Sequence, residues 1–203
     1  MNDRERIVTE WLARAEHFWI LSRVAVHEFG FLFPGMHLHA LALELMLKSA
    51  ILTLDPAGAA YSDLTRRTFR EGHDIMQLIE RWNGLCPERQ ITKRINGLLG
   101  WEESGCGLEL FERSFEALSK YTNPDMISRY FEGKLEWDAW AVDAANAVFF
   151  SVRKWVLAFL KVDRDPIDAA LEGNCGRTEG AAWLSRALRK SNMALPLEHR
   201  LIA

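Results

Sequence analysis

The chain has 203 residues, of which 49% are apolar and 26% charged, and its formal net charge is −3. This composition excludes a disordered chain, and the length gives a core large enough to fold without disulfides or structural metal. No apolar run reaches the roughly 18 residues of a membrane span and no signal-peptide core follows the first residues, so we expect a soluble, cytoplasmic protein with no membrane partner.

The net negative charge and the spacing of the cysteines limit the possible classes of function further. A protein that binds nucleic acid mainly through phosphate contacts carries an excess of Lys and Arg. Nucleic-acid binding by this chain therefore requires a local basic patch. The three cysteines are odd in number, widely spaced and without a CxxC pair. They indicate free thiols in a reducing compartment rather than a disulfide framework or a zinc site.

The first helices follow from apolar residues at three- and four-residue spacing. A long helix is expected over residues 3 to 29, with Asp3 as its N-cap and Gly30 as its stop. The next runs from Pro34 to Leu54 and is apolar nearly all round, which is typical of a helix buried on most sides. Shorter helices are expected over residues 75 to 82, 88 to 99 and 107 to 121.

The last long helix is expected from Leu135 to Val162, and no stretch has the period of a strand. The fold class is therefore all-α, an up-and-down helical bundle over residues 1 to 162. Residues 163 to 203 form a C-terminal appendage of linker, short amphipathic helix at 180 to 190 and tail. Small residues on the last helix and a surplus of tryptophan indicate a homodimer.

The apolar second helix carries three polar residues, His37, Glu44 and Lys48, within roughly 40° of one another on one stripe. Glu44 and Lys48 form an i,i+4 pair in the favoured order. On a buried helix a charge needs a partner, because an unpaired one costs several kcal/mol. The stripe is either a polar cluster lining a pocket or a structural ion pair at a helix seam.

Two further motifs have both a structural and a functional interpretation. His73 and Asp74 open a helix, where Asp74 caps backbone N–H groups and His73 is either a structural donor or an acid–base group. Arg129 and Tyr130 follow a Tyr-Thr-Asn-Pro break, and Arg129 either pairs with a carboxylate or faces an anionic ligand.

Several chemistries are excluded by the absence of their motifs. The chain has no Walker-type phosphate loop, no Gly-x-Ser-x-Gly elbow, no Glu-x-x-His and no His-Glu-x-x-His. His37 and His39 lie two positions apart, so on a helix they point about 200° from one another and make a poor metal pair. We therefore expect no metal and no cofactor.

The order of these pieces resembles the HEPN superfamily of small all-helical domains, which usually dimerise and often belong to prokaryotic defence or toxin–antitoxin systems. The resemblance covers about residues 8 to 160 through HALALELMLKSAIL, EGHDIMQLIE, KYTNPDMISRYFEG and the long final helix. It implies a polar cluster that converges across three helices, with matches at these positions: Glu44, Lys48, His73, Asp74, Tyr121, Arg129 and Tyr130.

One departure from the family bears on activity. RNase members have an Arg, four to six residues and a His near the final helix, whereas Arg153 here has no histidine after it until His199. We therefore expect a non-catalytic binding module for a nucleotide, an RNA end or a partner protein. The first alternative is a metal-independent ribonuclease with His73 as acid or base and Arg67 or Arg129 steadying the phosphorane charge. The second is a regulator or antitoxin that acts through the C-terminal helix.

Overall fold

The structure, a computed structural model, describes residues 2–27, 32–54, 74–93, 107–122 and 139–162. No strand occurs in these ranges, so the expected all-α helical class is confirmed. The elements are α1 (Asp3–His27), α2 (Leu32–Leu54), α4 (Ile75–Leu85), the 3-10 helix η2 (Pro87–Arg89), α6 (Gly107–Thr122) and α8 (Ala139–Leu160).

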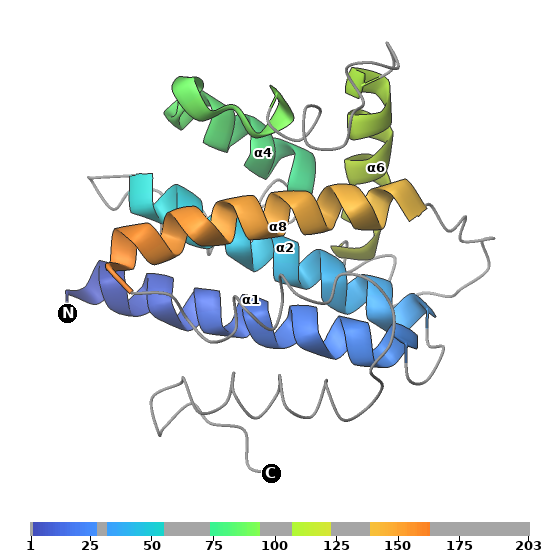
Figure 1. The fold of residues 1–203 in the computed structure, drawn as a ribbon, viewed down its shortest axis with the longest axis horizontal. Coiled ribbons are helices and arrows are strands. Elements are labelled where there is room, and N and C mark those ends of the chain that lie inside the picture. The colour runs from blue at the N-terminus through green and yellow to red at the C-terminus, as the bar shows by residue number, and fades with distance from the viewer. Residues whose placement is uncertain (1, 28–31, 55–73, 94–106, 123–138, 163–203) are drawn as a thin grey trace.

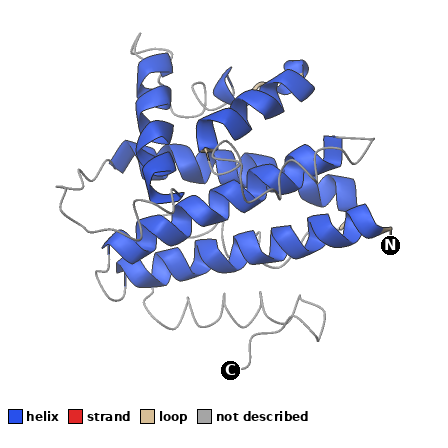
Figure 2. Cartoon of the chain, turned by 180° about the vertical axis from the view of Figure 1, so that it is seen from behind, coloured by secondary structure: helices blue, strands red, loops and turns tan. Residues whose placement is uncertain are grey.

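Helix α2 is the centre of the bundle and packs against α1, α4, α6 and α8. The long helices α1, α2 and α8 lie side by side, while α4 and α6 lie together on the side away from α1 (Figure 1). The view from behind shows the same arrangement (Figure 2). α1 and α2 are antiparallel, because Arg4 reaches the end of α2 at Leu52 and Ser22 lies against His39 nearer its beginning.

The apolar character of α2 follows from this central place. Its fully buried side chains include Leu43, Met46, Leu47 and Ile51. By length and composition Pro34–Leu54 is also long and apolar enough to cross a membrane, although Glu44 and Lys48 interrupt its apolar run. Since 72% of that window is buried inside the protein, a core helix accounts for the pattern.

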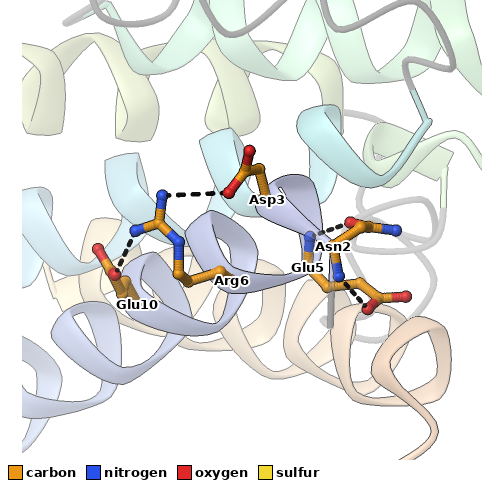
Figure 3. A network of polar contacts seen from close by, with 5 residues as sticks. All are labelled: Asn2, Asp3, Glu5, Arg6 and Glu10. Carbon is orange, nitrogen blue, oxygen red and sulfur yellow. Dashed lines mark hydrogen bonds and ion pairs between the residues drawn. The ribbon is translucent and has the colours of Figure 1, made fainter.

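The first turn of α1 is held by a capping box around Asn2 (Figure 3). The Asn2 side chain accepts from the Glu5 backbone N–H at 2.8 Å, and the Glu5 carboxylate accepts from the Asn2 backbone N–H at 3.0 Å. This reciprocal pair satisfies two donors that a helix start leaves open. The N-cap is therefore Asn2, and the sequence-based choice of Asp3 was wrong by one residue.

The other helix ends differ from expectation by a few residues, and one expected helix is interrupted. α1 ends at His27, α2 begins at Leu32, α4 continues to Leu85 and α8 ends at Leu160. Of the expected helix from 88 to 99, residues 88 and 89 lie in a 3-10 turn, Gln90 has a ψ of 119°, which is not helical, and residues 91 to 93 are helical. Residues 94–99 lie outside the described residues. Gly30, the start at Leu135 and the appendage 163–203 lie outside the described residues.

Gly35 lets α1 and α2 approach closely, and a matched pair of substitutions tests this. A Cβ added at Gly35 would lie 2.3 Å from Val26 Cγ2 and 3.2 Å from the Ser22 carbonyl oxygen. We expect Gly35→Ala to lower the free energy of unfolding by about 1–3 kcal/mol through overpacking. At Gly84 in α4 a Cβ meets nothing within 4 Å, so Gly84→Ala should raise stability by up to about 1 kcal/mol. Urea denaturation of both variants checks the prediction, and equal effects would contradict it.

Candidate functional site

Glu44 and Lys48 form a buried ion pair on the central helix. The Lys48 Nζ donates to Glu44 Oε1 at 2.6 Å, and the two side chains are 5% and 6% exposed for Glu44 and Lys48. The expected i,i+4 pairing is therefore confirmed, and it lies inside the bundle. Desolvation costs several kcal/mol for each charge, so each holds its place only through partners such as the other.

Asp74 acts as the N-cap of α4. Its Oδ1 accepts from the backbone N–H groups of Met76 at 2.9 Å and Gln77 at 3.3 Å. Ser119 of α6 donates weakly to the same oxygen at 3.4 Å and accepts from the Ile75 N–H at 3.1 Å. These contacts fix the start of α4 against α6, so the geometry supports the structural interpretation of Asp74.

His37 and Tyr121 are brought together, but through the tyrosine's backbone. The His37 Nδ1 lies 2.6 Å from the Tyr121 carbonyl oxygen, and because a carbonyl only accepts, Nδ1 carries the proton. The bond ties α2 to the end of α6, where a helix leaves its last carbonyls without helical partners. The Tyr121 side chain is buried, and burial raises the pKa of its hydroxyl.

Four of the candidate residues, His73, Arg129, Tyr130 and Arg67, lie outside the described residues. The structure therefore brings together one pair of the expected cluster, Glu44 with Lys48, and assigns Asp74 to a helix cap. Convergence of the whole cluster across three helices stays a prediction.

A second buried ion pair, between Glu16 of α1 and Arg153 of α8, was missed. The Arg153 Nε donates to Glu16 Oε1 at 2.5 Å, and Arg153 is 1% exposed while Glu16 is 6% exposed. The pair joins α1 to α8 through two residues that are 137 positions apart in the chain. The sequence contained one sign of this pair. Glu16 and Arg153 both fall within the apolar stripes of their helices, where a charge without a partner is costly.

Within the described ranges no group of three or more His, Cys, Asp or Glu side chains is arranged to hold a metal ion. Comparison of the chain with protein-family models, with curated proteins and with solved structures finds no match in any of the three.

Proposed function

We propose that the chain is a non-catalytic, HEPN-like binding module that recognises an RNA end or a nucleotide. The observation that carries this proposal is the buried pair of Arg153 with Glu16. Arg153 is the arginine of the final helix, the region in which RNase members of the HEPN superfamily place their catalytic arginine. Here its guanidinium binds a carboxylate in the interior, where it serves the packing of α1 against α8.

A guanidinium that steadies a phosphorane has to face the substrate with its donors directed at the developing charge. At 1% exposure Arg153 does not reach a bound RNA without opening the bundle. Lys48 is buried in the same way, and its ammonium binds Glu44 Oε1 at 2.6 Å. Arg153 and Lys48 are therefore both held by carboxylates inside the bundle, which favours binding over cleavage.

The ligand class follows from the candidate residues and the net charge. With a net charge of −3, the chain lacks the surplus that broad, salt-dependent phosphate binding uses. Recognition by a few local groups, His73, Arg129 and Tyr130 among them, suits a short ligand such as an RNA end or a nucleotide. In this proposal the protein is a cytoplasmic homodimer and belongs to a prokaryotic defence or toxin–antitoxin system.

The test uses a pool of labelled single-stranded and structured RNA, with EDTA present, read by gel for cleavage and by anisotropy for binding. The variants are His73→Ala and, as a control, His27→Ala at the end of α1. We expect intact RNA with all three proteins and weaker binding for His73→Ala alone. Cleavage by the wild type that His73→Ala loses would establish the ribonuclease instead. A chain that neither binds nor cleaves RNA or nucleotides would overturn the proposal and favour the regulator or antitoxin role.

A further inference from the structure

The seam between α1 and α2, formed by Ser22 and Val26 on α1 and by Gly35 and His39 on α2, contains a buried imidazole. His39 is 4% exposed, and its Nδ1 lies 3.4 Å from the Ser22 Oγ. The Ser22 hydroxyl itself donates to the Trp19 carbonyl at 2.6 Å. Because the hydroxyl proton is used there, the Ser22 oxygen is left to accept from His39, which places the His39 proton on Nδ1.

The other ring nitrogen of His39 has no place for a proton. Its Nε2 is buried and has no hydrogen-bond partner in the part of the chain that the structure describes. One turn earlier on the same helix, a Cβ at Gly35 would clash with Val26 Cγ2, so α1 and α2 are in close contact on this side of the seam. A second proton would put an unpaired N–H and a positive charge into this contact.

We propose that the seam between α1 and α2 is a pH-sensitive switch, in which protonation of His39 moves α1 away from α2. The charged neighbour acts in the same direction, since Arg23 of α1 repels an imidazolium at His39. The Arg23 guanidinium lies 5.8 Å from the centre of the Trp19 ring.

The Nε2 of His17 on α1 is also buried without a hydrogen-bond partner in the described part of the chain. Several other titratable groups on α2 and on the helices packed against it are engaged in contacts of their own. They are Glu44 with Lys48 on α2, His37 with the Tyr121 carbonyl of α6, Asp74 at the cap of α4, and Glu16 of α1 with Arg153 of α8. Among the described residues Arg23 is the charged group that acts on His39. No carboxylate among them therefore compensates the imidazolium.

The pH window follows from the direction of the shift. Burial, with a smaller contribution from Arg23, lowers the pKa of His39 from 6.5 to about 4. The open state therefore binds the proton more tightly than the closed state, and the closed seam is weakened as the pH falls below 6.5, with the full effect reached below 4. At pH 5.0 this difference makes opening about 30-fold more favourable than at neutral pH. Burial also lowers the pKa of His17 on α1, which adds to the trend.

Hydrogen exchange measured by mass spectrometry tests the switch on the full chain. We expect the protection of the peptide covering residues 17–27, corrected for intrinsic exchange, to fall about 30-fold between pH 7.5 and pH 5.0. His39→Leu, which carries no proton, should remove most of this fall and leave the smaller part due to His17. An equal fall in wild type and His39→Leu would overturn the proposal.

A second variant keeps the test valid if leucine at position 39 prevents folding. Arg23→Gln removes the repulsion, so the fall in protection at pH 5.0 should be smaller than in the wild type. Arg14→Gln makes the same change in charge at an exposed position of α1 and should behave as the wild type. Identical falls in both arginine variants would contradict the role of Arg23, and the absence of any fall in the wild type between pH 7.5 and pH 5.0 would overturn the switch itself.

Discussion

Glu16→Leu is expected to lower the free energy of unfolding by about 3–5 kcal/mol, among the largest effects of any single substitution in the described chain. The variant removes the carboxylate that Arg153 Nε binds at 2.5 Å, and Arg153 is 1% exposed. Water does not reach the guanidinium to replace the lost partner, so the cost of a desolvated charge is felt in the folded state alone. Urea denaturation followed by circular dichroism measures the change.

Helix α1, which carries Glu16, also has an exposed ion pair that serves as a control. Arg6 and Glu10 form an i,i+4 pair at 3.0 Å, with side chains 52% and 24% exposed (Figure 3). Glu10→Leu should cost less than about 1 kcal/mol, because solvent screens the pair. Equal costs for Glu10→Leu and Glu16→Leu would show that burial of the Glu16–Arg153 pair has no energetic weight.

Glu44→Leu is the second large effect, with an expected loss of about 3–5 kcal/mol. It leaves the Lys48 ammonium, whose side chain is 6% exposed, without the carboxylate oxygen that it contacts at 2.6 Å. Unlike the Glu16 pair, this pair lies within one helix, so its loss acts on the helix around which the other four pack. Chemical denaturation measures the loss.

A double-mutant cycle separates the pair from its surroundings. Glu44→Leu with Lys48→Met replaces both charges by apolar groups, and we expect its stability to return to within about 1–2 kcal/mol of the wild type. If the double variant is as unstable as the sum of the single variants, the two side chains act independently and the ion pair is not what holds them in the core.

The central position of α2 was predictable because apolar residues lie on nearly all sides of this helix. A segment that is apolar on all sides has no face to turn to water, and the structure surrounds α2 with four helices. Helix ends were less predictable, since they depend on single caps. Asn2 and Asp3 are both good N-cap residues, and only the reciprocal bond with Glu5 decides for Asn2.

In the candidate site, contacts between residues close in sequence were predictable, and contacts between distant residues were not. The bond of Lys48 to Glu44 and the cap at Asp74 are set by neighbours within four positions, and the sequence predicts both. The bonds of Arg153 to Glu16 and of His37 to Tyr121 join positions 137 and 84 apart. These bonds depend on which helices pack together, and the spacing of residues in the sequence does not reveal that. Charge inside an apolar stripe was the clue that could have marked Glu16 and Arg153.

We propose that Arg153 supports the interior of the bundle and takes no part in cleaving RNA. The most direct measurement is RNA cleavage and binding, in EDTA, by the wild type and by Glu16→Leu/Arg153→Leu, after denaturation has shown that the double variant is folded. We expect no cleavage by either protein and the same RNA affinity for both. Cleavage by the wild type that is lost in the folded double variant would make Arg153 a catalytic residue and contradict the account.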